Sequence, residues 1–419
     1  MRLTLTLCLA LLSSPVAAAA PDIGDLEDTA VDAPLPAVLP ESYAAAVVGD
    51  AALNRALHAL YSLNYSTGEA EAESFIAGNP DNPYGELFIS GMLWWRASTE
   101  LLRSVDDPAL ALSFDRHSRL AVVKSKRLFK AAQPRLRAEA FFVAGMSYGL
   151  RGQWRLTNRQ WLKAYLDGKK AIKHLRRCVE VDPLFHDAYL GLGIFDYQSA
   201  VLPGVLRIGA LLLVRGNRER GLARIRQAME KGQFARQQAA QFLLTILMAQ
   251  EKDSTGALAL LRELRKDFPE SVYYAGVEAA MLAASGDRQA AVGAWAAVYA
   301  QLAAEDAFDS KGWAVLCGAY ADACLVPERA TSAEAWIQGA LNSPPPSPPP
   351  GWESALHLVR GLARDSRRHA AGAREDYNAV AADPAAPPAL KRIAEACRVR
   401  PCVPERIIAL NRSRQKPTP

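Results

Sequence analysis

The stretch that decides the fold runs from residue 257 to residue 269 and reads ALALLRELRKDFP. In it, the small residue Ala257 is followed by Leu261, Leu264 and Pro269. Steps of four and three residues place the first three on one face of a helix. A small side chain lets a second helix approach closely, a large one fills the groove between helices, and a proline ends the helix. The stretch therefore predicts the second helix of a closely packed helical hairpin.

The same spacing recurs along the chain, which indicates an internal repeat. The copies that keep the closing proline are Ala171, Leu175, Cys178, Pro183 and, more weakly, Gly68, Ala72, Phe75, Pro80. The copies without it are Gly221, Ile225, Ala228, then Ala291, Trp295, Val298, then Ala373, Tyr377, Val380. Alternating runs of β-branched residues are absent, so the pattern predicts an all-α protein.

Partner helices are expected upstream of these copies. They are marked by Phe141, Ala144, Gly145, Tyr148, then by Tyr189, Leu192, Gly193, and then by Gln241, Leu244, Thr245, Met248. Thr245 precedes Ala257 by the twelve residues that a simple hairpin needs. The intervals from Gly145 to Ala171 and from Gly193 to Gly221 are more than twice as long. They predict two helical insertions, near residues 150–168 and 197–216.

This pattern resembles the tetratricopeptide repeat. The resemblance implies a solenoid of helical hairpins, wound as a right-handed superhelix over residues 43–343. Within residues 52–269, a narrower set of motifs is similar to the tetratricopeptide repeat protein 39 family and its fungal outer-membrane or inclusion-clearance relatives. These motifs are residues 56–61, Trp94-Trp95, Leu202-Pro203 and residues 216–222. That family has no established catalytic residues, so the resemblance implies a fold and neither a catalytic site nor a cofactor.

The first twenty residues have the features of a secretory signal peptide. Arg2 precedes an apolar run at residues 3–12, which is too short to span a bilayer, and small residues follow at residues 17–20. We expect cleavage near residues 18–20 and export of the mature chain to the periplasm or another part of the cell envelope.

Composition marks the remaining boundaries. Residues 21–42 are acidic and contain several prolines, which predicts a flexible leader. Residues 344–351 are almost all proline and predict a stiff linker. A C-terminal helical piece is expected at residues 352–411, followed by a disordered tail at residues 412–419.

Five cysteines remain after removal of the signal peptide. Cys397 and Cys402 bracket a short turn-like segment, so a local disulfide is expected in an oxidising compartment. No cysteine or histidine spacing fits a zinc site, and the sequence predicts neither a metal nor a cofactor.

The chain carries a net charge of +5, and its basic residues concentrate between residues 151 and 177, where Asp167 is the only acid. Steps of four residues on one helix would align four of these cations in a stripe, at Arg151, Arg155, Arg159 and Lys163. Trp154 and Trp161 flank the stripe, and Lys170 lies further on. One interpretation is a solvated face whose tryptophans pack inward. The other is a binding site for a partner such as an acidic peptide or an anionic lipid, with nucleic acid not expected for an exported chain.

The second insertion, residues 197–214, is apolar, and its candidate contact residues are Leu202, Leu206 and Leu211. Pro203 and Arg207 interrupt it, so it does not predict a transmembrane helix. It is interpreted either as an extra buried helix or as an apolar groove that holds a lipid or small ligand.

Gly145 to Gly149 read GMSYG and match the nucleophile elbow of serine hydrolases, with Ser147 as the nucleophile. That motif requires a preceding strand, whereas this segment reads as helix. The sequence therefore predicts a non-catalytic exported scaffold or adaptor that binds a protein partner on a concave surface. Lipid or small-ligand binding is the alternative, hydrolysis through Ser147 is a remote one, and the oligomeric state is left open.

Overall fold

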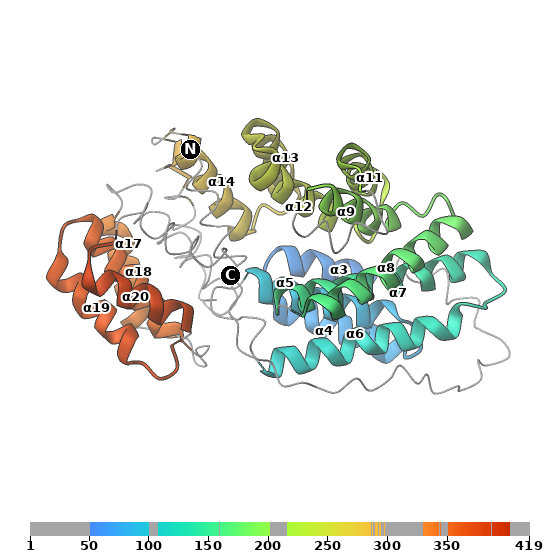
Figure 1. Ribbon diagram of the computed structural model, residues 1–419, viewed down its shortest axis with the longest axis horizontal. Helices are drawn as coiled ribbons and strands as arrows, with labels where there is room; N and C mark the ends of the chain where they lie inside the picture. The colour runs from blue at the N-terminus through green and yellow to red at the C-terminus, as the bar shows by residue number, and fades with distance from the viewer. Residues whose placement is uncertain are drawn as a thin grey trace.

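The computed structural model describes residues 51–99, 108–158, 160–201, 216–285, scattered positions between 287 and 297, and then 330–342, 344, 351–386 and 388–402. The predicted signal peptide, leader and tail, and most of the proline-rich linker, lie outside this part of the chain. Every regular element in the described part is a helix, and no strand occurs there (Figure 1). The all-α prediction is confirmed.

The first group of helices shares one hydrophobic core. Its members are α3 (Ala51–Tyr61), α4 (Tyr65–Gly78), α5 (Tyr84–Thr99), α6 (Pro108–Leu128), α7 (Pro134–Thr157), α8 (Trp161–Val181), α9 (Ala188–Val201), α11 (Arg218–Lys231), α12 (Arg236–Ile246) with the π-helical turn η1 (Leu247–Glu251), α13 (Ser254–Asp267) and α14 (Val272–Ser285). Most of the described connections are short, and helices that are neighbours in sequence pack on one another. Short connections of this kind produce antiparallel hairpins.

Side chains next to the helix starts explain why several helices begin where they do. The side-chain oxygens of Asn64, Asn217 and Asp253 each accept a hydrogen bond from a backbone N–H in the first turn of α4, α11 and α13. Such N-caps satisfy donors that have no partner within the helix.

The small residues chosen from the sequence lie where helices cross. A Cβ added to Gly145 would lie 2.6 Å from Cγ of Leu175, so α7 and α8 touch at that point. A Cβ added to Gly193 would lie 2.8 Å from the carbonyl oxygen of Gly221, so α9 and α11 approach backbone to backbone. The pairing of these helices, predicted from the spacing alone, is observed.

The first insertion takes the form of longer helices. Helix α7 has 24 residues and α8 has 21, and they are joined by a turn around Asn158. Residues 150–168 are therefore the end of one long helix and the start of the next. The second insertion begins as the last turn of α9, and most of it, residues 202–215, lies outside the described residues.

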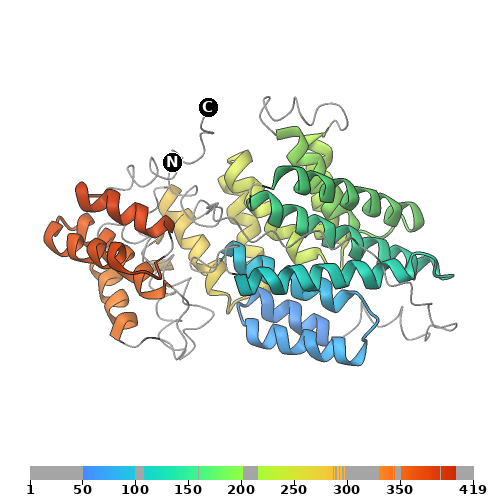
Figure 2. The same ribbon diagram turned by 60° about the horizontal axis from the view of Figure 1, so that its bottom comes forward.

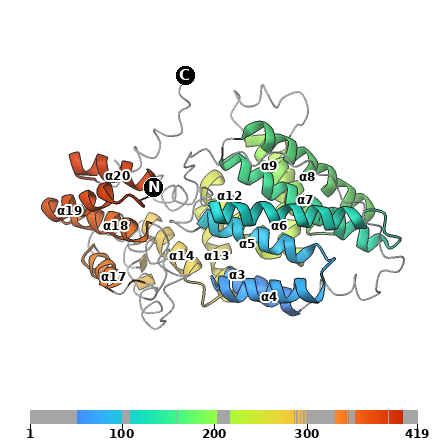
Figure 3. The ribbon, with the colours of Figure 1, turned by 90° about the horizontal axis from the view of Figure 1, so that it is seen from below.

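The second group of helices has its own hydrophobic core. It comprises α17 (Ala330–Asn342), α18 (Trp352–Ser366), α19 (Ala370–Ala382) and α20 (Pro388–Val399). In Figures 1, 2 and 3 these orange and red helices form a group of their own beside the blue-to-green helices. Helix α17 packs on α18, although its position before the proline-rich linker puts it within the predicted superhelix of residues 43–343.

Candidate functional site

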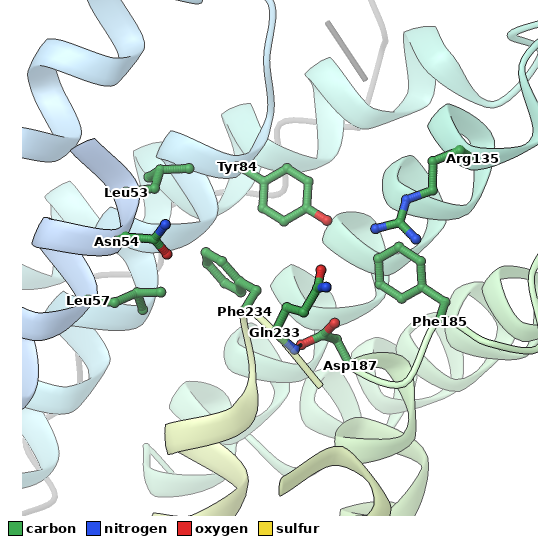
Figure 4. A pocket seen from close by; sticks show the side chains of 9 residues that line it. All are labelled: Leu53, Asn54, Leu57, Tyr84, Arg135, Phe185, Asp187, Gln233 and Phe234. Atoms are coloured by element: carbon green, nitrogen blue, oxygen red, sulfur yellow. Dashed lines mark hydrogen bonds between the residues drawn. The ribbon is translucent and has the colours of Figure 1, made fainter. Parts of the chain in front are cut away.

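A hollow in the first group of helices is lined by five segments that are far apart in sequence (Figure 4). Helix α3 provides three residues, α5 and α7 provide one each from their first turns, and the α8–α9 and α11–α12 connections provide two each. The lining residues are Leu53, Asn54, Leu57, Tyr84, Arg135, Phe185, Asp187, Gln233 and Phe234. We call this the α3 hollow.

Arg135 carries the positive charge of the α3 hollow. Its guanidinium lies over the ring of Phe185, 4.8 Å from the ring centre. It also donates a hydrogen bond from Nε to Oε1 of Glu139 at 2.9 Å, and its Nη1 lies 3.5 Å from Oδ2 of Asp182. Burial raises the pKa of Glu139, and the hydrogen bond and charge of Arg135 oppose that rise. The guanidinium is thus held in place by a ring and two carboxylates.

Asp187 holds together the two connections that line the α3 hollow, α8–α9 and α11–α12. Its buried Oδ1 accepts hydrogen bonds from the backbone N–H groups of Gln233 at 2.9 Å and Ala235 at 2.6 Å. Burial raises the pKa of Asp187, although both backbone hydrogen bonds favour the charged form. One carboxylate therefore ties the α8–α9 connection to the α11–α12 connection, and it places Gln233 and Phe234 at the rim.

Aromatic rings form the floor of the α3 hollow. Tyr84 meets Phe234 edge-on, with 5.2 Å between ring centres, and the ring centre of the buried Phe142 lies 5.2 Å from that of Phe185. Burial raises the pKa of Tyr84, so its phenol stays protonated and can donate a hydrogen bond. Together with the exposed amides of Asn54 and Gln233, the hollow offers apolar contact area with hydrogen-bonding groups around it.

None of these lining residues was predicted from the sequence. Arg135 and Glu139 stand four residues apart, which is a detectable sign of an ion pair on a helix. Phe185 and Phe234 lie in connections, and nothing in their local sequence indicates that they approach the same point.

The predicted basic stripe is divided between two helices. Arg151 is almost fully buried on α7, 3.7 Å from Oδ2 of Asp167, and Arg155 reaches the same oxygen at 2.8 Å. Because α7 ends at Thr157, Lys163 lies on α8, and Arg159 falls outside the described residues. The four residues therefore do not line up along one helix, and the carboxylate of Asp167 is enclosed by two of them.

Trp154 turns toward the protein, whereas Trp161 and Lys170 are exposed. Trp154 is buried and stacks on Phe114 with 4.2 Å between ring centres, but Trp161 is 59% exposed, so only one of the two tryptophans packs inward. The ammonium of Lys170 lies 5.1 Å from the ring centre of Tyr148.

Ser147 lies in the middle of helix α7 and is fully buried. A nucleophile elbow places its serine on a sharp turn after a strand, and neither feature occurs here. In the described structure the Ser147 hydroxyl is enclosed by helix packing.

The remaining predicted sites have different outcomes. Leu202, Leu206 and Leu211 lie outside the described residues. Cys397 and Cys402 are joined in a disulfide with 5.0 Å between their Cα atoms, and Cys178 is a buried free thiol. Among the described residues, no cluster of three or more metal-binding side chains occurs. No described helix is both long enough and apolar enough to cross a membrane.

The fold and the α3 hollow define an all-α protein built of sequentially packed helical hairpins. No protein-family model and no curated protein matches the chain.

Proposed function

We propose that this chain is an exported, non-catalytic scaffold of tetratricopeptide type that binds a protein partner over the surface around the α3 hollow. The helix crossings support the architecture. Gly145, Gly193 and Gly361 each lie on a first helix and touch the second helix of the same hairpin, as tetratricopeptide units require. Stacked hairpins of this kind create extended surfaces that suit protein partners.

The observation that carries the proposal is the convergence of five segments on one hollow. The hollow combines aromatic rings, an arginine held over a phenylalanine, and exposed amides at the rim. Aromatic and arginine side chains contribute most of the binding energy in many protein interfaces. Because ion pairs and backbone hydrogen bonds already hold Arg135 and Asp187, a partner would meet a preformed surface.

The state of the acidic groups favours binding over catalysis. Glu139 is paired with Arg135, and Asp187 accepts backbone hydrogen bonds, so both carboxylates have structural roles. The hydrolase alternative is tested with a serine-reactive probe. We expect no labelling of the folded protein, and labelling that disappears in Ser147→Ala would overturn the non-catalytic proposal.

Photo-cross-linking in living cells tests the binding surface. A photoreactive amino acid is placed at Asn54 or at Gln233, both exposed on the rim, and at Glu263 on the exposed side of α13 as the control. We expect the two rim positions to capture the same protein and the control to miss it. Leu57→Glu, which places a charge on the apolar part of the hollow, should abolish the capture. Equal capture at all three positions, or none at the rim, contradicts the proposal.

Export has its own test. Mass spectrometry of the protein recovered from the envelope fraction should find an N-terminal peptide that starts within a residue or two of position 20. Recovery of an intact chain starting at Met1 from the cytosol would contradict the signal-peptide prediction.

A further inference from the structure

The turn between α7 and α8 exposes large apolar side chains. Leu156, in the last turn of α7, has half of its surface exposed. The first two turns of α8 add four more, namely Trp161 at 59%, Leu162 at 71%, Tyr165 at 40% and Leu166 at 48% exposure. We call these five residues the α8 tip. They are most of the large apolar side chains exposed in the described structure, and such gathering on a surface marks an interaction site.

The hairpin does not need these side chains in order to close. The opposite side of α8 packs on α7, where Gly152 approaches the backbone oxygen of Ala164 and the Cβ of Asp167. The residues at 161, 162, 165 and 166 share the other face because they are spaced by one, four and five positions. The exposed apolar face is therefore additional to the core of the hairpin.

Cations follow directly on the same helix. Lys169, Lys170, Lys173 and Arg176 are exposed in the next turns of α8. The ammonium of Lys169 lies 5.7 Å from the ring centre of Tyr165, beside the apolar residues. Before Glu180 the only acid of α8 is Asp167, which is buried against Arg155. The outer face of α8 thus changes from apolar to positively charged, and it exposes no negative charge up to Arg176.

We propose that the α8 tip docks on an anionic phospholipid surface. Tryptophan, tyrosine and leucine are favoured at the boundary between head groups and acyl chains, and lysines beside them attract lipid phosphates. The spacing also fits. Lys169 and Lys170 lie three and four residues beyond Leu166, which is about 5–6 Å along the helix axis. The interfacial layer of one leaflet is roughly 5–8 Å thick. An inserted tip would place these ammonium groups at the level of the phosphates.

This surface is separate from the α3 hollow, so the two proposals can fail independently. Membrane docking requires neither the protein partner nor an intact hollow. In combination, one end of the molecule would lie at a membrane while the hollow stays open to a partner.

Co-sedimentation with vesicles tests the docking. The full chain is mixed at low salt with vesicles of equal parts phosphatidylcholine and phosphatidylglycerol. We expect the protein to sediment with them and added salt to weaken the binding. The double variant Trp161→Ser, Leu162→Ser should bind roughly tenfold less or weaker still, because it removes two large apolar side chains from the contact. Leu184→Ser is the matched control, since Leu184 is an equally exposed leucine in the α8–α9 connection.

The cations are tested in the same assay. Lys169→Gln with Lys173→Gln should weaken binding severalfold, at roughly 1 kcal/mol per cation near the surface. Lys231→Gln, an exposed lysine at the end of α11, should have no effect. Circular dichroism shows whether each variant is folded. Absence of binding, equal binding to pure phosphatidylcholine vesicles, or unchanged binding of the double variant overturns the proposal. So does a dimer in analytical ultracentrifugation that Leu162→Ser dissolves, because a second copy would then cover the tip.

Discussion

His174 lies within a stack of aromatic rings and couples the fold to pH. Its ring centre is 5.1 Å from that of Phe129 and 5.7 Å from that of Tyr148, to which it is parallel. Burial, followed by the charges of nearby lysines with Lys173 first, lowers the pKa of His174 to about 4. A histidine in the unfolded chain titrates near pH 6.5, so the unfolded form takes up the proton first as the pH falls. His174 therefore contributes its full share to the free energy of unfolding above about pH 6.5, and this contribution is lost as the pH falls toward 4.

We therefore expect His174→Phe to reduce the acid sensitivity of the protein. Between pH 7 and pH 5 the variant should lose roughly 2 kcal/mol less unfolding free energy than the unmodified chain. Urea unfolding at the two pH values measures the difference. If the two proteins lose stability in parallel, His174 does not titrate as described.

Asp376 plays a different role, because its charge is retained. Its carboxylate is 1% exposed and accepts hydrogen bonds from Nδ1 of His357 at 2.8 Å, Nη2 of Arg360 at 2.6 Å and Nη1 of Arg364 at 2.9 Å. Burial alone would raise the pKa of Asp376, but these hydrogen bonds and charges outweigh it and lower the pKa.

Replacing Asp376 by Asn should strongly destabilise the second group of helices. Two arginines and a histidine would lose their common carboxylate, and breaking a buried ion pair costs about 3 kcal/mol or more. Thermal unfolding followed by circular dichroism gives the shift, with Asp383→Asn in the α19–α20 connection as a nearby comparison. Equal effects of the two substitutions would contradict the role given to Asp376.

Among the elements, the hairpin of α9 and α11 depends most directly on glycine. Gly193→Ala would place a methyl group 2.8 Å from the carbonyl oxygen of Gly221. The methyl group is attached to the backbone of one helix and the oxygen belongs to the backbone of the other, so neither can move without moving its helix. We expect a loss of roughly 1–3 kcal/mol in unfolding free energy, because the helices must separate to make room.

Gly168 provides the control within α8. A Cβ added there meets no atom within 4 Å, so Gly168→Ala should stabilise the helix by roughly 0.5–1 kcal/mol. Urea unfolding of the two variants should move in opposite directions. A shift of the same sign in both would mean that the crossing at Gly193 is not as tight as described.

The sequence predicted the helix crossings more successfully than the helix ends. A small residue followed by a large one at four positions and an apolar one at seven lies on a single helix, so Ala171 and Gly221 are recognisable from the sequence. The first helices are recognisable from a separate local pattern that includes Gly145 and Gly193. The turn after Thr157 was not, because Asn158 ends α7 through a hydrogen bond from its side chain to the carbonyl oxygen of Trp154 at 3.1 Å. Without that boundary, Arg159 and Lys163 read as a continuation of the same helix.

For the C-terminal hairpin of α18 and α19, the sequence predicts only the second helix. Ala373 and Tyr377 were identified as part of a second helix, but the partner position was missed. A Cβ added to Gly361 would lie 2.6 Å from Cε1 of Tyr377, and Gly361 precedes Ala373 by the same twelve residues as Thr245 precedes Ala257. Residue spacing within single helices does not predict the α3 hollow, because its five segments meet only after the hairpins have stacked.

At the scale of the whole molecule, the described residues form two hydrophobic cores. One is shared by α3 to α14 and the other by α17 to α20. No broad packing joins a helix of one group to a helix of the other within the described part of the chain.

We expect the two cores to unfold as two cooperative units. Differential scanning calorimetry should resolve two transitions, with Gly193→Ala lowering the melting temperature of one and Asp376→Asn that of the other. A single transition that both substitutions shift by similar amounts would contradict this division.

The carboxylate of Asp187 also bears on the segment between α9 and α11. It holds the chain just before α9 to the chain just before α12, and α9 and α11 cross at Gly193 and Gly221. The rim of the hollow is thus anchored on both sides of the segment between α9 and α11. Both anchors lie in described residues outside that segment, so a change in its length or sequence would leave the rim in place.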